Sequence, residues 1–290
     1  MQHQITAATD ELLEGLEIYR CYKRSKFLSL KHSSYFHVYE ELLAKYRGRD
    51  ITFVEIGVLN GGSLFMWRDY FGPSARVIGI DVNPDAKRWE EFGFEIFLGS
   101  QSDERFWDEL FSLVGDVDIV LDDGGHINEQ QIVTTEKCIP HIKEGGMLIV
   151  EDTHTSYIAN FGNPSRYSFI SYCKALMDSI NSRFPAVRIS DNPLNQMVSS
   201  IHIYESIVCF RIDRARCFVS SPTSNSGISS NSADFRDRGS LLHEGIAVLK
   251  RKLPFLQTVG IIRLIGSKLA SAMYSMRSKI QSRKLRRYFH

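Results

Sequence analysis

The stretch FVEIGVLNGGS, residues 53 to 63, decides the fold class of this chain. A short apolar run ends at Ile56, a glycine-rich bend follows, and a helical pattern begins after the bend. The glycines of the bend, Gly57, Gly61 and Gly62, allow positive φ angles and a close approach of the backbone to a ligand. Parallel α/β sheets bind ligands beyond the carboxyl ends of their strands, so the bend is predicted to line a binding crevice.

Short apolar runs alternate with longer amphipathic stretches on the carboxyl side of this bend. The runs are 52–56, 77–81, 94–98, 117–122 and 147–151. This alternation predicts βαβ units and a parallel sheet that is covered on both faces. Two further runs, 197–204 and 206–212, follow so closely that they predict an antiparallel hairpin. We therefore expect an α/β fold with a Rossmann-like, doubly wound sheet of five parallel strands, a C-terminal hairpin, and helices on both faces.

Composition divides the chain into four segments. Residues 1–50 carry apolar side chains at helical spacing and are expected to form helices, with a basic loop or flap at 23–34. The sheet defines a domain at 51–218. A run rich in Ser and Asn then predicts a flexible linker at 219–240, followed by a helical segment at 241–290.

The basic C-terminal end has several interpretations. Residues 250–290 carry eleven Lys or Arg and no acidic residue. The amphipathic part at 263–290 could pack on the domain or on a second subunit of a homo-oligomer, or it could lie on an anionic membrane surface. Contact with nucleic acid is the third interpretation, after packing on protein and contact with a membrane, and it is the least expected.

The overall composition is that of a globular protein, with 43% hydrophobic and 24% charged residues. The net charge of +1 argues neither for nor against nucleic acid. The five cysteines are scattered without a C-x-x-C pair, which indicates reduced thiols rather than disulfides or a zinc site. No apolar run has the length of a transmembrane helix, so we expect a cytoplasmic protein with membrane association as an open alternative.

A second cofactor element is IGIDVNP at 78–84, where Asp81 closes a strand 24 residues after Gly57. A carboxylate at this point can accept hydrogen bonds from both ribose hydroxyls of a nucleoside. The dinucleotide fingerprint requires glycine where this chain has Leu59, which weighs against NAD. S-adenosylmethionine (SAM) has no phosphate and does not need that glycine. A bend with a purely structural role is the alternative.

A third element is LGSQSDERFW at 98–107, which follows the third predicted strand. Ser100 and Gln101 lie where a loop could meet the edge of an adenine ring. Asp103 has a simpler role open to it, because an aspartate before a helix caps the backbone N–H groups of the first turn.

Two predicted strands end in acidic pairs, in VLDDGGHINEQ at 120–130 and LIVEDTHT at 148–155. Adjacent parallel strands would bring four carboxylates into one crevice, where they repel one another unless a cation neutralises them. Oxygen ligands suit magnesium, calcium or manganese. Asp122 is expected to point away and support the loop, because neighbouring side chains of a strand face opposite sides. The three acids expected to turn toward the crevice are Asp123, Glu151 and Asp152.

His126 lies three residues beyond Asp123, after two glycines. A hydroxyl bound to a metal is more acidic than a free one, and a neutral imidazole nearby can take its proton. We therefore expect His126 to be the general base, with an ordinary loop histidine as the alternative. His154 is a weaker candidate, and the aromatic loop at 153–168 is a candidate lid over the substrate.

These pieces together resemble a known family, the metal-dependent macrolide sugar O-methyltransferases of the mycinamicin and tylosin tailoring type, and the related cephalosporin hydroxylase-like methyltransferases. The matching pieces are E-I-G-x-x-x-G-G-S at 55–63, G-I-D at 79–81, G-S-Q-S-D at 99–103, D-D-G-G-H at 122–126 and G-G-x-x-x-x-E-D at 145–152. The resemblance spans residues 30–212. The chain departs from it at Gly125, where the family often has serine, and the basic C-terminal segment has no counterpart.

The resemblance implies a class I SAM-dependent O-methyltransferase that uses Mg²⁺ and acts on a hydroxyl of a small or sugar-containing acceptor. It implies that Asp123, Glu151 and Asp152 bind the magnesium ion and that the base is His126. It implies a SAM pocket lined by Glu55, Gly57, Ser63, Asp81, Ser100 and Gln101. Three alternatives stay open: a glycan- or nucleotide-binding module without turnover, an NAD-dependent oxidoreductase, and a methyltransferase for catechol-like phenols.

Overall fold

The computed structural model describes residues 7–162, 166–187 and 192–228, and near the C-terminus residues 279, 282, 283 and 285–288. The chain divides into two units, residues 1–222 and 223–290, and the sheet lies in the first. The predicted segment at 241–290 and the predicted linker from residue 229 onward lie almost entirely outside the described residues. Within the described ranges, no helix combines the length and the apolarity that crossing a membrane requires.

Seven strands form one sheet in the order β3-β2-β1-β4-β5-β7-β6. Their bounds are β1 Thr52–Ile56, β2 Arg76–Asp81, β3 Glu95–Leu98, β4 Val117–Asp122, β5 Ile142–Val150, β6 Val198–Tyr204 and β7 Ile207–Ile212. The first five strands run parallel, and β7 pairs antiparallel with both β5 and β6. The predicted fold class, five parallel strands followed by an antiparallel hairpin, is therefore confirmed.

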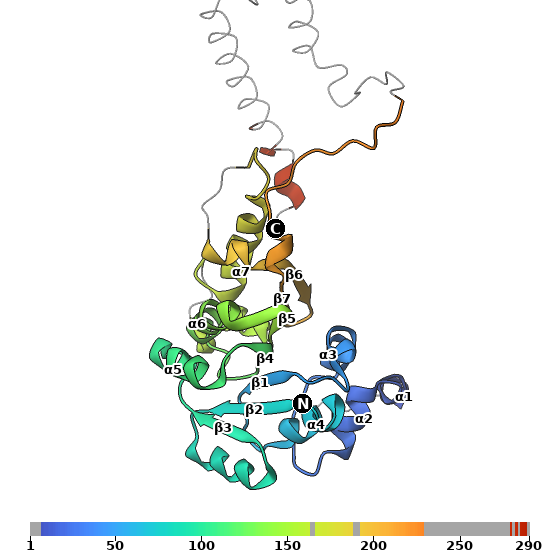
Figure 1. The fold of residues 1–290 in the computed structure, drawn as a ribbon, viewed down its shortest axis with the longest axis vertical. Coiled ribbons are helices and arrows are strands. Elements are labelled where there is room, and N and C mark those ends of the chain that lie inside the picture. The colour runs from blue at the N-terminus through green and yellow to red at the C-terminus, as the bar shows by residue number, and fades with distance from the viewer. Residues whose placement is uncertain are drawn as a thin grey trace, which may run out of the picture. The chain divides into compact units, whose positions relative to one another are not determined.

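Helices cover both faces of this sheet, as Figure 1 shows. One side holds α1 Ala7–Glu14, α2 Glu17–Arg24, α3 Tyr35–Leu43 and α4 Gly62–Phe71, and the other holds α5 Glu104–Val114, α6 Asn128–Cys138 and α7 Phe169–Asn181. Short 3-10 helices are η1 Ala44–Tyr46, η2 Pro84–Phe92, η3 Ile139–His141, η4 Thr153–Tyr157, η5 Ala159–Phe161, η6 Pro193–Gln196, η7 Arg214–Arg216 and, in the second unit, η9 Arg286–Tyr288. Phe53 packs on the first side and Val54 on the second, because neighbouring residues of a strand face opposite ways.

The strand β5 starts earlier than the apolar pattern indicates. Its apolar run begins at Met147, but the strand begins at Ile142 and includes Gly145 and Gly146. The pairing with β4 shifts register at this point, between Val117 and Ile119. This irregular register lets β5 include Gly145 and Gly146, although glycines are typical of loops. The glycine pair therefore does not mark where this strand begins.

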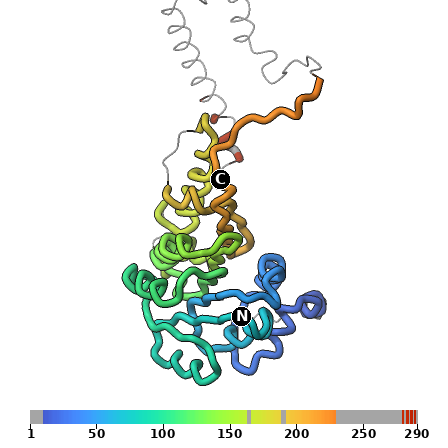
Figure 2. Tube along the Cα trace, viewed as in Figure 1, coloured from blue at the N-terminus to red at the C-terminus, as the bar shows by residue number. Residues whose placement is uncertain are grey.

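The segment between α2 and α3 lies against α4 on one side of the sheet. Residues 25–34 form the loop that the sequence predicts. Ser25 Oγ donates a hydrogen bond of 2.7 Å to the carbonyl of Gly62, and Arg24 forms an ion pair of 2.8 Å with Asp69. Figure 2 shows the N-terminal helices beside the strands that they cover. These contacts carry the loop to the carboxyl ends of the parallel strands.

Candidate functional site

A cavity of about 670 Å³ lies at the carboxyl ends of the parallel strands. Seven of the predicted site residues line it: Gly57, Asp81, Gln101, Asp123, His126, Glu151 and Asp152. The N-terminal segment completes the wall with Tyr22, Leu30, Lys31, His32 and Tyr35. The predicted cofactor residues that are not part of this wall are Glu55, Gly61, Gly62, Ser63 and Ser100. The cavity thus joins the end of β2 to the ends of β4 and β5.

The bend after β1 is held close to the loop after β4. Gly57 has a φ of +90°, and a Cβ atom there would lie 2.1 Å from the carbonyl oxygen of Asp123. The Gly57 amide donates to the carbonyl of Ile80, and the Asp123 amide donates to the carbonyl of Ile56. A side chain at position 57 would displace Asp123, so the geometry requires glycine there.

The carboxylate of Asp81 is fixed by backbone amides. Its Oδ2 accepts hydrogen bonds from the amides of Val58 and Leu59 at 2.9 and 3.0 Å, and its Oδ1 accepts from the amide of Asn83 at 2.9 Å. A carboxylate oxygen has two acceptor sites, so Oδ2 is fully used by these two amides, while Oδ1 can still accept a hydroxyl from a ligand in the cavity.

Glu55 and Ser63 lie behind the glycine-rich bend. The buried carboxylate of Glu55 accepts hydrogen bonds from Ser63 Oγ at 2.8 Å and from Trp67 Nε1 at 3.0 Å. Burial raises the pKa of Glu55 to about 7, although the charge of Lys31 and the two hydrogen bonds act in the opposite direction. These two residues therefore support the bend from the inside.

Gln101 supports the loop after β4. Its Nε2 donates to the buried carboxylate of Asp122 at 2.9 Å, and its Oε1 accepts from the amide of Gly125 at 2.9 Å. Asp122 turns away from the cavity, as predicted, and burial raises its pKa to about 6. Asp103 caps α5 by accepting a hydrogen bond from the amide of Arg105, which confirms the capping role predicted for it.

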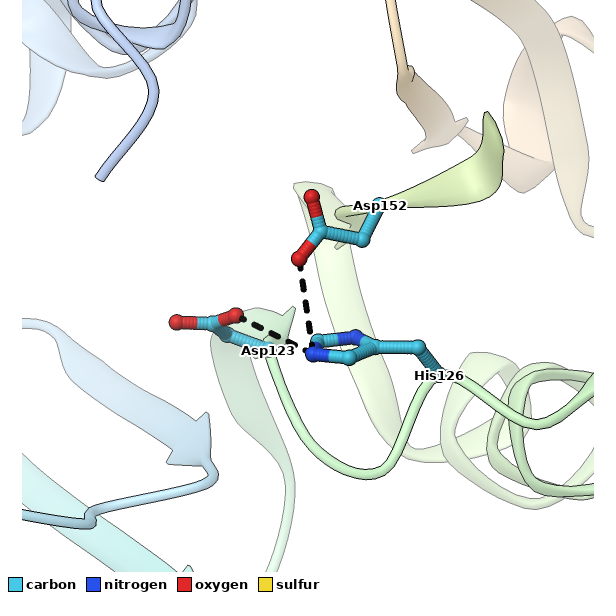
Figure 3. A group of neighbouring side chains, drawn as sticks. All are labelled: Asp123, His126 and Asp152. Atoms are coloured by element: carbon cyan, nitrogen blue, oxygen red, sulfur yellow. Dashed lines mark ion pairs between the residues drawn. The ribbon is translucent and has the colours of Figure 1, made fainter. Parts of the chain in front are cut away.

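Asp123, His126 and Asp152 converge in one place (Figure 3). His126 Nε2 lies 3.4 Å from Asp152 Oδ2 and 3.9 Å from Asp123 Oδ1. All three potential ligand atoms lie within 4.8 Å of one another. Ligands of one magnesium ion, each about 2.1 Å from it, lie at most about 4.2 Å apart, so small side-chain rotations would bring these atoms onto one ion.

The backbone is strained at two of these three residues. His126 and Asp152 have φ angles of +56° and +54°, in the left-handed region that residues other than glycine seldom adopt. His126 Nδ1 is buried and has no hydrogen-bond partner among the described residues. Strain of this kind persists where the surroundings over-determine it, which is common at functional sites.

Lys31 is a site residue that the sequence analysis did not identify. Its side chain is 1% exposed, and its Nζ lies 2.6 Å from Asp123 Oδ2, 3.1 Å from Glu151 Oε2 and 4.0 Å from Glu55 Oε1. Burial alone would lower the pKa of Lys31, but the three carboxylates outweigh burial and raise its pKa above the usual value. The ammonium group is therefore a permanent positive charge inside the acidic cluster.

Helix α3 adds two tyrosines to the same cluster. Tyr39 donates to Glu151 Oε1 at 2.5 Å, and Tyr35 donates to Asp152 Oδ1 at 2.5 Å. Burial raises the pKa of Glu151 well above its usual value, and the charge of Lys31 opposes this. In the sequence, Lys31, Tyr35 and Tyr39 are four positions apart, but Lys31 precedes α3 and the spacing alone does not distinguish these residues from an ordinary helix face.

The other predicted residues lie at the edge of the site. His154 is 47% exposed, with its Nδ1 2.6 Å from Ser206 Oγ and 3.9 Å from Asp152 Oδ1, so His126 is the nearer histidine. In the predicted lid, the ring centroid of Phe161 lies 6.4 Å from the ring centroid of His126. Residues 163–165 of that loop lie outside the described residues.

Known proteins are similar in sequence and in fold to the part of the chain that contains the sheet and the cavity. Residues 54–153 match a family model described as a methyltransferase domain. The 8-demethyl-8-alpha-L-rhamnosyl tetracenomycin-C 2'-O-methyltransferase of Streptomyces olivaceus is 32% identical over 200 residues, which are 62% of this chain and 52% of that protein. The mycinamicin VI 2''-O-methyltransferase of Micromonospora griseorubida is 30% identical over 183 residues, 58% of this chain and 45% of that protein.

The solved structure of the MycE methyltransferase from the mycinamycin biosynthetic pathway, in complex with Mg, SAH and mycinamycin VI, superposes with a TM-score of 0.61 at 26% identity. The match covers 79% of this chain and 58% of that chain. The chain thus spans about half the length of the curated relatives it matches. These similarities confirm the predicted resemblance and the Rossmann-like fold.

Proposed function

We propose, on the premise that residues 54–153 match a methyltransferase domain, that this protein transfers a methyl group from SAM to a hydroxyl group of a sugar-containing small molecule. One observation carries the proposal. A single cavity is lined on one side by Gly57 and Asp81 and on the other by Asp123, His126 and Asp152. A nucleoside cofactor and a divalent cation can therefore be held next to each other.

The cofactor side of the cavity suits SAM. Asp81, fixed by three backbone amides, would accept a hydrogen bond from a ribose hydroxyl through Oδ1, and Gly57 lines the same cavity. Leu59 replaces the glycine that a dinucleotide needs, which disfavours the NAD-dependent alternative. The relative of known structure was determined with SAH, the product of methyl transfer from SAM.

The opposite side suits a magnesium ion or a similar divalent cation. The donors that fit are the carboxylates of Asp123 and Asp152, with Glu151 as the third predicted ligand. When bound, such a cation stabilises the negative charge of a deprotonated hydroxyl. Hard oxygen donors are the ligands that magnesium prefers. The related structure contains Mg, which supports this choice of metal.

His126 is the proposed general base. Its Nε2 faces the oxygens of Asp123 and Asp152, on the side where an acceptor hydroxyl would meet the metal. With a cation bound, these two carboxylate oxygens would turn to the metal, and an unprotonated Nε2 would take the proton of the acceptor hydroxyl. Most of the acceleration would come from positioning the hydroxyl against the methyl donor and from stabilising its negative charge.

The acceptor class comes from the relatives, whose names give a rhamnosyl tetracenomycin and mycinamicin VI as the molecules that are methylated. A sugar hydroxyl is therefore the proposed acceptor, ahead of a catechol-like phenol. A homo-oligomer and a membrane contact through residues 263–290 stay predictions, because almost all of that segment lies outside the described residues.

Calorimetry of the full chain tests the cofactor first, with titrations of SAM in Mg²⁺ and in EDTA and with NAD as the control. Micromolar SAM binding without NAD binding is the expected result. Release of SAH is then measured with alkyl rhamnosides as acceptors, in Mg²⁺ and in EDTA. A protein that binds SAM but releases no SAH with any sugar would favour the binding-module alternative, and no SAM binding would end the proposal.

A further inference from the structure

One buried hydroxyl group joins the two strained turns of the site. Thr155 Oγ1 donates toward the carbonyl oxygen of His126 at 2.9 Å and toward the carbonyl oxygen of Asp152 at 2.8 Å. His126 follows β4 and Asp152 follows β5, and both residues have φ angles in the left-handed region. Thr155 is 2% exposed, so its hydroxyl is shielded from solvent. This hydroxyl therefore ties the turn after β4 to the turn after β5.

The backbone of the turn at His126 is held from two directions. On its amino side, the amide of Gly125 donates to Gln101 Oε1 at 2.9 Å. At its own carbonyl, Thr155 supplies the hydroxyl. A left-handed conformation costs about 1–2 kcal/mol in a residue other than glycine, and it persists where neighbouring contacts over-determine it. Of these two contacts, the one from Thr155 also reaches Asp152, so it constrains both strained residues at once.

The imidazole of His126 depends on this backbone for its orientation. A functional histidine is commonly oriented through the ring nitrogen that faces away from the reaction, by a hydrogen bond to a carbonyl or a carboxylate. His126 Nδ1 is buried and makes no such bond within the described ranges. The direction of the ring is therefore set mainly by the conformation of the turn that carries it.

We propose that Thr155 is a positioning residue for methyl transfer, whose hydroxyl places His126 and Asp152 relative to each other by bridging their carbonyl oxygens. This inference rests on the function proposed above, in which His126 is the base and Asp152 a metal ligand. The hydroxyl carries one proton, which the two carbonyls share, so removing it releases both turns together. A displacement of about 1 Å would misplace the base against the acceptor hydroxyl, which can lower the rate about 100-fold.

Two substitutions in the full chain separate the hydroxyl from the rest of the side chain. With alkyl rhamnosides and Mg²⁺, Thr155→Ala is expected to lower kcat for SAH release by about 30- to 100-fold, with the KM for the acceptor within about 3-fold of wild type. Thr155→Ser keeps the hydroxyl and should restore kcat to within about 3-fold. Equal losses in the two variants, or an unchanged kcat for Thr155→Ala, would overturn the inference.

Thr135→Ala is the matched control for the loss of a buried hydroxyl. Thr135 is also buried, and its Oγ1 donates to the carbonyl of Gln131 at 2.7 Å, away from the cavity wall. We expect this variant to keep the wild-type kcat, because the bond that it loses touches neither strained turn. A loss as large as that of Thr155→Ala would show a general effect of destabilisation and would contradict the positioning role.

Two further measurements do not depend on turnover. The SAM affinity of each variant, measured by calorimetry, reports whether it folds, and Thr155→Val fills the site and takes the place of Thr155→Ala if that variant binds no SAM. Crystal structures of wild type and variant then show the turns directly. We expect the φ angle of His126 or Asp152 to leave the left-handed region when the hydroxyl is absent, and two unchanged turns would overturn the inference. Wild-type protein that releases no SAH with any sugar would overturn the proposed function alone, because this comparison of structures needs no acceptor.

Discussion

The Nζ atom of Lys31 lies 2.6 Å from Oδ2 of Asp123, although the two residues are 92 positions apart in the chain. The loop after α2 supplies the lysine, and the end of β4 supplies the aspartate. The contact therefore ties the N-terminal segment to the carboxyl edge of the sheet. Lys31, together with Tyr35 and Tyr39 of α3, thus completes the acidic cluster from the N-terminal part of the chain.

Replacing the proposed base should slow methyl transfer without affecting cofactor binding. His126→Gln is expected to lower kcat by about 10²- to 10⁴-fold, because no other imidazole lies as close to Asp123 and Asp152 among the described residues. The SAM dissociation constant should stay within about 3-fold, since other cavity residues hold the cofactor. His141→Ala is the matched control, because His141 stacks on Phe111 away from the cavity. An unchanged kcat for His126→Gln would remove this residue from the mechanism.

Asp81 should determine the affinity for SAM. Asp81→Ala removes the acceptor for a ribose hydroxyl and for the amides of Val58 and Leu59, and SAM binding should weaken by about 30-fold or more. Calorimetry measures the change directly. Asp85→Ala serves as the control, since Asp85 is exposed on η2 and is not part of the cavity wall. Equal affinities for the Asp81 variant and the wild type would contradict the placement of the ribose.

Glycine should be indispensable at position 57 and replaceable at position 48. A methyl group at Gly57 would lie 2.1 Å from the Asp123 carbonyl oxygen, whereas at Gly48 it meets nothing within 4 Å. Both have positive φ angles, +90° and +70°, so both alanine variants lose about 1–2 kcal/mol to backbone strain. Gly57→Ala should lose about 2 kcal/mol more through the clash. Urea denaturation of the two variants measures the difference, and equal losses would show that the approach to Asp123 is not tight.

The buried Glu55 should make stability depend on pH. Its pKa is raised from 4.5 to about 7 by burial, so the folded state binds a proton more tightly than the unfolded state does. The stability from this proton is complete below about pH 4.5 and is lost as the pH rises through 7. Glu55→Gln removes this pH-dependent stabilisation, so its free energy of unfolding relative to wild type should rise by about 2.5 kcal/mol between pH 5 and pH 8. Urea titrations at both pH values test this, and parallel pH curves for the two proteins would contradict it.

The sequence predicted the sheet closely. Five parallel strands and a hairpin follow from runs of apolar residues, because strands covered on both faces must be apolar along their whole length. The run at 52–56 coincides with β1, and the others agree within a few residues except at β5. There the early start depends on a register shift against β4, which no local pattern of residues encodes.

What the sequence determined by itself is the sheet and the acids at its carboxyl edge, since apolar periodicity and strand order suffice to bring Asp123 and Asp152 together. What only the tertiary structure decided is how each of these acids is engaged. Lys31 is one of many lysines in the sequence, and its four-residue spacing from Tyr35 and Tyr39 reads equally well as an ordinary helix face. Packing of its loop against α4 carries the ammonium to Glu151. A charge buried by such long-range contacts leaves no local signature, because its partners are set by packing and not by neighbours in the chain.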